Sequence, residues 1–273
     1  MNIKKACKIL NVSRSGYYKY LEHKPSARDI ENEVLSAEIR KIFEEHKGRY
    51  GSLRISKVLE QNGIKVNRKR VARLMRLMGL YSKGSQYKYK KYHRNNSKEE
   101  HANLLNQIFK ASDKNKIWVG DITYIPTQKK TLYLAVYIDI FSRKVVGWAM
   151  DTRMKDQLVI SAFNQAFGKE HPEPGLIVHT DQGAQFIGNN FQMLLKARKA
   201  IHSTSRKGNP YDNALMESFY RTLKRELIQD AHFETPEQAQ KEIFKYIGLY
   251  YNTKRMHSSL GYVSPSQFEE LNS

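Results

Sequence analysis

The chain has 273 residues, of which 40% are hydrophobic, so it can fold as one large domain or as two modest ones. Its 47 Lys and Arg residues outnumber its 27 Asp and Glu residues and give a formal net charge of +20, which favours a polyanionic partner, although a merely soluble basic protein can share this balance. A single cysteine excludes a disulfide framework and a cysteine-based zinc site. The sequence shows neither an apolar signal region nor a membrane-length segment, so we expect a cytoplasmic protein.

The first 24 residues predict a short segment that resembles a helix-turn-helix. Residues 4–10 and 14–21 have helical character, and Ser13 between them is a good N-cap for the second helix. A helical hairpin with a purely structural role fits these residues equally well.

Residues 28–80 predict a helix-turn-helix DNA-binding domain with helices over 29–47, 52–61 and 68–78. In the third helix, apolar residues recur at helical spacing and form one buried stripe, while Asn67 can cap its start and Gly79 can end it. Every charge in this helix is positive, which favours insertion along a DNA groove over a solvated face of mixed charge. The candidate DNA contacts are Arg68, Lys69, Arg70, Arg73 and Arg76.

Residues 81–112 predict a basic linker, because they lack apolar periodicity. Lys and Arg alternate with Tyr in its first half, which favours phosphate contact with occasional base stacking, and a flexible tether is the alternative. Its candidate DNA contacts are Lys88, Lys90 and Lys91.

Residues 113–273 predict a second domain, which is built on strands. Three β-branched or aromatic runs at 116–125, 132–140 and 144–150 indicate an antiparallel meander. A helix at 155–167, a strand at 176–180, a helix at 189–197, a strand at 201–204 and a long helix at 213–228 follow, and Asp212 can cap the last of these. The pattern is that of an α/β domain with a mixed sheet and flanking helices.

Three acidic residues in this domain point to its chemistry. Asp121 lies inside an apolar run, Asp181 ends another, and Glu217 shares a helix face with Arg221 and Lys224. Carboxylates among apolar neighbours are costly unless a cation meets them, and Mg²⁺ or Mn²⁺ is the natural partner of converging oxygen ligands. A simple salt bridge between Glu217 and Arg221 on a solvated face is the alternative for the glutamate.

The segments around these acids together resemble the transposases of bacterial insertion sequences, of the OrfB type, and more broadly the retroviral-integrase superfamily. The matching segments are residues 118–125, 137–148, 179–186, 208–217 and 251–260, and the resemblance covers nearly the whole chain. Thirty-five residues separate Asp181 from Glu217, and Lys224 follows the glutamate by seven places, as the family pattern requires.

The resemblance implies an RNase H-like catalytic core, with a mixed five-stranded sheet, over residues 113–273, preceded by the all-α DNA-binding region. It implies that Asp121, Asp181 and Glu217 are the catalytic triad and bind two Mg²⁺ (or Mn²⁺) ions roughly 3.5–4 Å apart. The implied activity is cleavage of DNA strands at the ends of an insertion sequence, followed by strand transfer through in-line phosphoryl transfer. Lys224 is implied to hold a terminal phosphate.

The implied partners are double-stranded DNA, at the terminal inverted repeats of the element and at the target, and further copies of the chain. A further implied partner is a protein from an upstream reading frame, which ribosomal frameshifting would fuse to this chain. A non-catalytic DNA-binding regulator and a simple RNase H-like nuclease are the alternative functions.

Two other residues in the matching segments resemble site residues. Asp139 lies at a strand end, where an aspartate commonly accepts turn N–H groups, so we do not expect it to join the three acids. For His257 we expect a structural role or contact with a DNA phosphate rather than catalysis.

Overall fold

The computed structural model describes residues 2–22, 24–84, 103–105, 110–206 and 210–272. The chain divides into two compact units, residues 1–85 and residues 86–273. The candidate contacts Lys88, Lys90 and Lys91 lie outside the described residues. No helix among the described residues is both long and apolar enough to cross a membrane.

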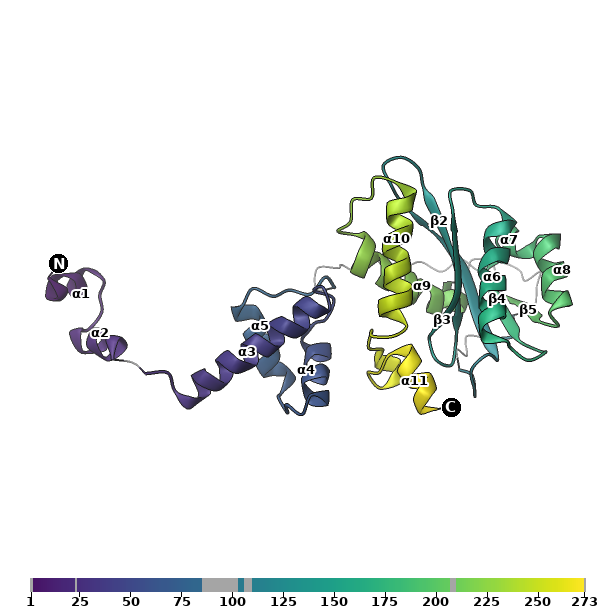
Figure 1. Ribbon diagram of the computed structural model, residues 1–273. Coiled ribbons are helices and arrows are strands. Elements are labelled where there is room, and N and C mark those ends of the chain that lie inside the picture. Colours follow the sequence, from purple (N-terminus) through teal and green to yellow (C-terminus); the bar gives the residue numbers. More distant parts are fainter. Residues whose placement is uncertain (1, 23, 85–102, 106–109, 207–209, 273) are drawn as a thin grey trace. The chain divides into compact units, whose positions relative to one another are not determined.

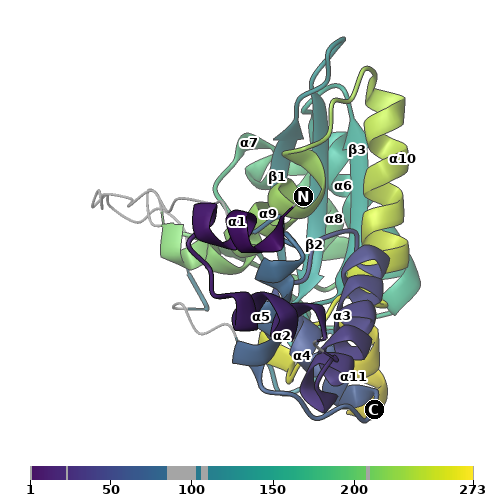
Figure 2. The ribbon, with the colours of Figure 1, turned by 90° about the vertical axis from the view of Figure 1, so that its left-hand side faces the viewer.

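All the regular elements that the structure describes in the N-terminal unit are helices, as predicted (Figures 1 and 2). Its helices are α1 (Ile3–Ile9), α2 (Arg14–Leu21), α3 (Ala27–Glu45), α4 (Ser52–Gln61) and α5 (Arg68–Leu77). The Ser13 side chain caps α2 and the Asn67 side chain caps α5, which confirms both predicted N-caps. Helices α3, α4 and α5 share a small apolar core that includes Ile39, Ile55 and Val71, each fully buried.

The C-terminal unit is built on one five-stranded sheet. Its strands are β1 (Ile117–Ile125), β2 (Leu132–Asp139), β3 (Val145–Asp151), β4 (Ile177–Thr180) and β5 (Ile201–Thr204), in the order β3-β2-β1-β4-β5. The first three strands are antiparallel, whereas β4 and β5 run parallel to β1. The predicted meander and the mixed sheet are therefore confirmed.

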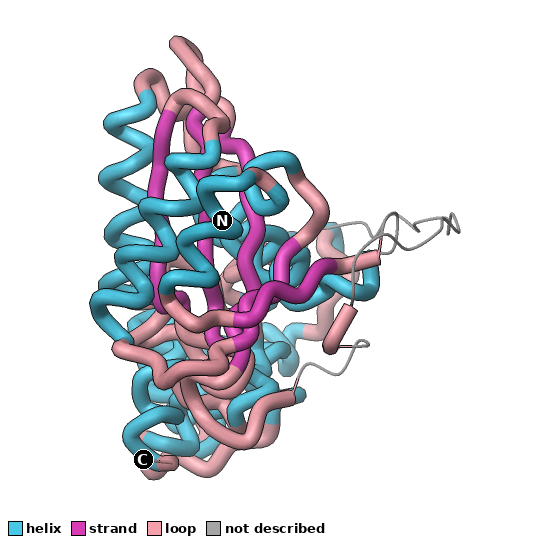
Figure 3. Tube along the Cα trace, turned by 90° about the vertical axis from the view of Figure 1, so that its right-hand side faces the viewer, coloured by secondary structure: helices cyan, strands magenta, loops and turns pink. Residues whose placement is uncertain are grey.

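Helices cover both faces of this sheet. On one face lie α6 (Asp156–Glu170), α7 (Ala184–Ile187) and α8 (Asn189–Ala197), whose apolar residues form a core with Trp118 and Tyr137. Helix α6 packs so closely on β3 that a side chain at Gly147 would overlap Ala162 and Ala166. Helix α10 (Pro236–Tyr246) lies on the other side of the sheet from α6 (Figure 1). Figure 3 distinguishes the strands of the sheet, in magenta, from the helices around it, in cyan.

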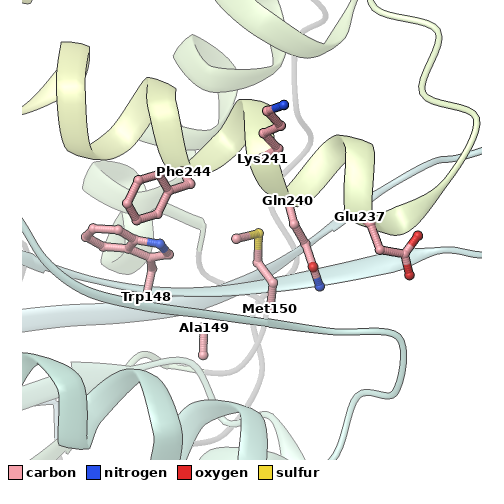
Figure 4. Close-up of a pocket in the computed structure, with 7 residues that line it drawn as sticks. All are labelled: Trp148, Ala149, Met150, Glu237, Gln240, Lys241 and Phe244. Carbon is pink, nitrogen blue, oxygen red and sulfur yellow. The ribbon is translucent and has the colours of Figure 1, made fainter.

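The alternation of side chains along β3 shows how one strand serves both faces. Trp148 and Met150 point toward α10, whereas Ala149 points to the opposite side (Figure 4). The Trp148 ring lies 6.3 Å from that of Phe244 on α10. Ala149 packs against the core beneath α6.

The long helix predicted over 213–228 is present from residue 214 to residue 228, but its last turn is π-helical. A 3₁₀ turn, η1 (Pro210–Asn213), precedes it, and it consists of the α-helix α9 (Ala214–Leu223) and the π-helical turn η2 (Lys224–Ile228). The predicted capping role of Asp212 is wrong, because its carboxylate instead accepts hydrogen bonds from the backbone N–H and the guanidinium of Arg206. Such π-helical turns often occur near functional sites, and this one begins at Lys224.

The C-terminal tail is tied to the sheet by buried polar contacts. After α10 it contains η3 (Ile247–Tyr251), η4 (Ser258–Leu260) and α11 (Pro265–Leu271). The side-chain amide of Asn252 both accepts from and donates to the backbone of Val145, at 2.9 Å each, and so pairs with edge strand β3 as another strand would. Arg255 forms a buried ion pair with Glu226, at 2.8 Å. The family-like tail segment therefore has a structural role.

Candidate active site

Asp121 and Asp181 lie side by side where β1 and β4 separate. These parallel strands are paired from Ile117 opposite Ile177 to Gly120 opposite Thr180. Asp121 follows Gly120 within β1, and Asp181 directly follows Thr180, the last residue of β4. The geometry follows from the sequence, because an apolar run leads to each acid and equal register brings the two runs to the same point. The residue before Asp121 is a glycine, and a side chain at Gly120 would overlap the ring of Tyr137.

Helix α9 is fixed over Asp121 by two hydrogen bonds. The Asn213 amide donates to Oδ2 of Asp121 at 2.8 Å, and the Tyr220 hydroxyl donates to the Asp121 carbonyl oxygen at 2.6 Å. Glu217 lies four residues after Asn213 and three before Tyr220, so helical spacing places it on the same side of the helix. Sequence reasoning missed Asn213 and Tyr220, although this spacing around Glu217 could have indicated both.

Burial is the main cause of the raised pKa values of the three acids. Burial, followed by the charge of Asp181, raises the pKa of Asp121 to about 7. Burial also raises the pKa of Asp181, and it raises the pKa of Glu217 against the opposing charge of Arg221. The ionised forms of these carboxylates are therefore disfavoured until a cation compensates them.

The structure brings two of the three acids together. Glu217 is an exposed side chain whose charge reaches Asp121. Among the residues that the structure describes, no three His, Cys, Asp or Glu side chains are gathered closely enough to hold a metal ion. The expected meeting of all three carboxylates thus stays a prediction.

The loop before α9 is fixed by buried polar groups. His179 is fully buried on β4, where its Nδ1 pairs with the Ser203 hydroxyl at 2.8 Å and its Nε2 with the Asp212 carbonyl at 3.0 Å. Asp212 is itself buried and bound to Arg206. These contacts tie the start of α9 to β4, the strand that leads to Asp181.

The candidate cations near the acids have different surroundings. The ammonium nitrogen of Lys224 lies 4.7 Å from the centre of the Tyr124 ring, three residues after Asp121 on β1. Arg221 is exposed, on the Glu217 side of α9. A cation held on an aromatic face keeps its N–H donors available for a phosphate.

In the N-terminal unit, most of the predicted contacts on α5 are available to a ligand. The exposed ones are Arg68, Lys69, Arg73 and Arg76. Arg70 instead turns toward α3, where its guanidinium donates to Glu31 at 2.9 Å and to Asn32 at 2.8 and 3.0 Å. This residue therefore helps to join α5 to α3.

Asp139 and His257 have structural surroundings. The Asp139 carboxylate accepts the backbone N–H groups of Asn115, Phe141 and Ser142, which confirms the predicted turn contacts. His257 Nε2 lies 3.1 Å from Nη1 of Arg255, and its ring meets Tyr251 edge to face.

Comparison with known protein families covers both units. An HTH-like domain matches residues 29–89, and two integrase core domain families match residues 111–210 and 198–265. These matches support the predicted order of a helix-turn-helix region followed by an RNase H-like core. Among solved structures, the HTLV-2 integrase catalytic core domain in complex with magnesium aligns with a TM-score of 0.44 and 22% identity, over 59% of this chain and 99% of that one.

Individual relatives match along almost their whole length. The transposase for insertion sequence element IS904 of Lactococcus lactis is 62% identical, over 93% of this chain and 100% of that protein. The transposase InsF for insertion sequence IS3A of Escherichia coli is 39% identical, over 99% of this chain and 95% of that protein. The chain therefore belongs to the insertion-sequence transposases with an integrase catalytic core.

Proposed function

We propose that this transposase cleaves DNA strands at the ends of an insertion sequence and joins them to new sites by in-line phosphoryl transfer at Asp121, Asp181 and Glu217. The observation that carries the proposal is the pair Asp121 and Asp181, two desolvated carboxylates at adjacent strand positions. The repulsion between these two carboxylates does not stabilise the fold. A site that binds cations requires such closely placed negative charges. The presence of this pair favours the enzyme over a DNA-binding regulator.

The donor set fits Mg²⁺ or Mn²⁺, because it contains only carboxylate oxygens and its buried charges need a compensating cation. Asp121 and Asp181 would hold the ions, and Glu217 would complete the set from the facing side of α9. When bound, two such ions activate the attacking water or 3′-hydroxyl and neutralise charge on the leaving oxygen.

The neighbouring side chains prepare the site before any ligand arrives. Asn213 and Tyr220 fix the Asp121 side chain and backbone, so that the carboxylate is held in one orientation. Lys224, resting on Tyr124, would hold a DNA phosphate next to the reacting one. Arg221 would neutralise a further phosphate beside Glu217.

The N-terminal unit would bind the DNA of the element. We assign this role to residues 28–80, with the exposed cations of α5 as the phosphate contacts. The terminal inverted repeats and the target would be its double-stranded partners, and the chain would act in the cytoplasm as a homo-oligomer on DNA. An upstream-frame protein, fused by frameshifting, would be a further partner.

Replacement of Asp181 by Asn tests the catalytic part of the proposal. We expect Asp181→Asn to abolish cleavage and joining of a labelled duplex made from the DNA that flanks the gene, while binding of that duplex is unchanged. Asp151→Asn is the matched control, because Asp151 lies at the far end of β3, and it should keep both activities. Joining that survives Asp181→Asn would rule out the proposed site.

Substitutions in α5 test the DNA-binding part. Replacing Lys69, Arg73 and Arg76 by Ala should flatten the salt dependence of DNA binding, by about 0.9 in log–log slope for each DNA phosphate that is no longer neutralised. The charge-matched control replaces Arg28, Arg40 and Lys41, which are exposed on α3, and should leave the slope unchanged. An unchanged slope in the α5 variant would remove this helix from the DNA interface.

A further inference from the structure

Helix α9 begins at a residue whose side chain does not cap the helix. Asn213 occupies the N-cap position, but its side chain makes no capping hydrogen bond to the first turn of α9, all of which the structure describes. The Asn213 amide instead donates to the Asp121 carboxylate at 2.8 Å. An N-cap side chain normally fixes the start of a helix, so other contacts must hold Asn213 in place beside Asp121.

His179 on β4 supplies such a contact. Its Nε2 lies 3.0 Å from the carbonyl oxygen of Asp212, and that carbonyl belongs to the peptide group that joins Asp212 to Asn213. A peptide group is planar, so a contact that fixes its carbonyl also fixes the direction in which the Cα of Asn213 leaves it. The histidine therefore acts on the position of Asn213 through one rigid group.

The partners of the His179 ring determine which nitrogen carries the proton. A carbonyl oxygen can only accept a hydrogen bond, so Nε2 carries the proton that the Asp212 carbonyl accepts. Nδ1 then accepts the hydroxyl proton of Ser203 at 2.8 Å, and the Ser203 oxygen accepts the backbone N–H of Leu104 at 3.0 Å. The ring is fully buried, and burial lowers its pKa, which favours this neutral form.

A structural role and a role in the reaction make different demands on this ring. A buried polar group weakens the fold unless its hydrogen bonds are made, so the Ser203 bond to Nδ1 and the Asp212 bond to Nε2 both contribute to stability. A purely structural role would therefore depend on both nitrogens alike. A role that reaches Asp121 through Asn213 depends on Nε2.

We propose that His179 is a positioning residue for the reaction, which holds the Asp212–Asn213 peptide group through Nε2 and thereby keeps the Asn213 amide on the Asp121 carboxylate. The proposal rests on the proposed function, since it concerns the same reaction at Asp121. His179 does not itself touch the reacting groups. Its loss lets the Asp121 carboxylate leave the orientation that the reaction requires, so the rate falls while DNA binding remains.

Two amide side chains separate the roles of the two ring nitrogens. The amide nitrogen of a glutamine reaches the position of Nε2 and keeps a donor to Asp212, whereas the shorter asparagine reaches only the position of Nδ1. With the labelled flanking-DNA duplex at saturation, His179→Asn should lower the cleavage rate by up to about 100-fold, the loss that a displacement of about 1 Å can cause. His179→Gln should keep a rate close to that of the wild type. The affinity for the duplex without divalent metal should be unchanged in both variants.

Hydrogen exchange of the full chain, without divalent metal or DNA, gives a measurement that does not depend on the reaction. Residues 217–220 donate the first backbone hydrogen bonds within α9, so their amide protons report on how firmly the start of the helix is held. These protons should exchange faster in His179→Asn than in the wild type. In His179→Gln they should exchange at the wild-type rate.

Ser203→Ala is the matched control, because it removes the hydrogen bond on the other side of the same buried ring. It should lower the stability but keep the cleavage rate of the folded protein and the exchange rates in α9, since Nε2 keeps its proton and its acceptor. Asn213→Ser removes the contact with Asp121 at a half-buried position. In that background, His179→Asn should have no further effect on the cleavage rate.

A wild-type cleavage rate in His179→Asn would overturn the proposal. So would equal losses of rate in His179→Asn, His179→Gln and Ser203→Ala, because a purely structural role predicts them. If His179→Asn does not fold, His179→Gln decides alone. A wild-type cleavage rate and wild-type exchange in α9 then support the proposal, and loss of either contradicts it.

Failure of this proposal can be told apart from failure of the proposed function. Wild-type chain that cuts the duplex while His179→Asn cuts it equally well contradicts the positioning role alone. Wild-type chain that binds the duplex but does not cut it with Mg²⁺ or Mn²⁺ contradicts the proposed function, and the exchange rates in α9 still decide whether His179 holds the start of the helix.

Discussion

Asp121 and Asp139 are two desolvated aspartates on the paired strands β1 and β2, three residue pairs apart, and they have different surroundings. Asp139 lies opposite Trp118, while Asp121 lies opposite Val136. Burial raises the pKa of both carboxyl groups. Asp139 accepts three backbone N–H groups, which fix a turn, whereas Asp121 lies beside Asp181 and beneath a helix that carries Glu217.

The comparison shows that burial alone does not identify a catalytic acid. A buried carboxylate that backbone donors surround stabilises the fold, and its replacement leaves those donors without a partner. A buried carboxylate next to a second carboxylate destabilises the fold, and a functional requirement explains why it is kept. Substitutions at the two positions should therefore have opposite effects on stability.

The largest effect should come from Asp121→Asn. We expect cleavage and joining of the flanking-DNA duplex to fall below detection, because a carboxamide is a poor ligand for a divalent cation. Without divalent metal, the free energy of unfolding in urea should rise, because the repulsion from Asp181 is removed. A loss of stability would show that Asp121 resembles Asp139 after all.

Asp139→Ala should have the opposite outcome. We expect the free energy of unfolding of the C-terminal unit to fall by about 3 kcal/mol, because buried N–H groups lose their charged acceptor. Asp139→Asn, which keeps one acceptor oxygen, should cost less. The activity of the folded fraction should remain, and its complete loss in stable protein would place Asp139 in the catalytic site.

The next largest effect should be a change with pH in the free energy of unfolding, caused by the Asp121 carboxyl group. The folded-state pKa of Asp121 is about 7 against an ordinary value of 3.8, so the folded chain keeps this proton to higher pH than the unfolded chain does. The stability that the proton provides is present below pH 3.8 and is lost as pH rises to about 7. Urea unfolding without divalent metal should show this decline in the wild type, with a smaller decline in Asp121→Asn. Equal declines would contradict the assignment.

The smallest effect should come from Tyr124, whose ring supports Lys224. Tyr124→Leu should lower the joining rate about two- to fivefold, the value of an exposed cation–π contact. Tyr124→Phe keeps the aromatic face and should keep the wild-type rate. In a Lys224→Gln background, Tyr124→Leu should have no further effect, and a further loss there would show that Tyr124 acts independently of Lys224.

Much of this architecture follows from local sequence patterns. β-Branched, aromatic and apolar runs predicted all five strands. Ser13 and Asn67 were recognisable as caps because they precede helical stretches. The sequence could also predict that Asp121 and Asp181 lie close together, because an apolar run leads to each of them.

Contacts between distant residues were beyond such patterns. The sequence suggests that Asp212 caps a helix, but the guanidinium of Arg206 competes successfully for its carboxylate. The sequence groups Arg70 with the DNA-contacting basic residues of α5. In the structure α5 packs against α3, and Arg70 donates hydrogen bonds to Glu31 and Asn32. The ion pair between Glu226 and Arg255 likewise joins residues that lie far apart in the sequence, and the helical pattern around Glu226 does not predict it.

The central claim, that the three acids bind the catalytic metal directly, is tested most directly by exchanging the ligand atom of one of them. Asp181→Cys replaces a carboxylate oxygen by a thiolate, which Mg²⁺ binds poorly and the softer Mn²⁺ accepts more readily. The labelled flanking-DNA duplex is used, with activity compared in Mg²⁺ and in Mn²⁺. We predict no joining by Asp181→Cys in Mg²⁺ and measurable joining in Mn²⁺, with the wild type active in both. Full activity of Asp181→Cys in Mg²⁺ would contradict direct binding of the metal by Asp181.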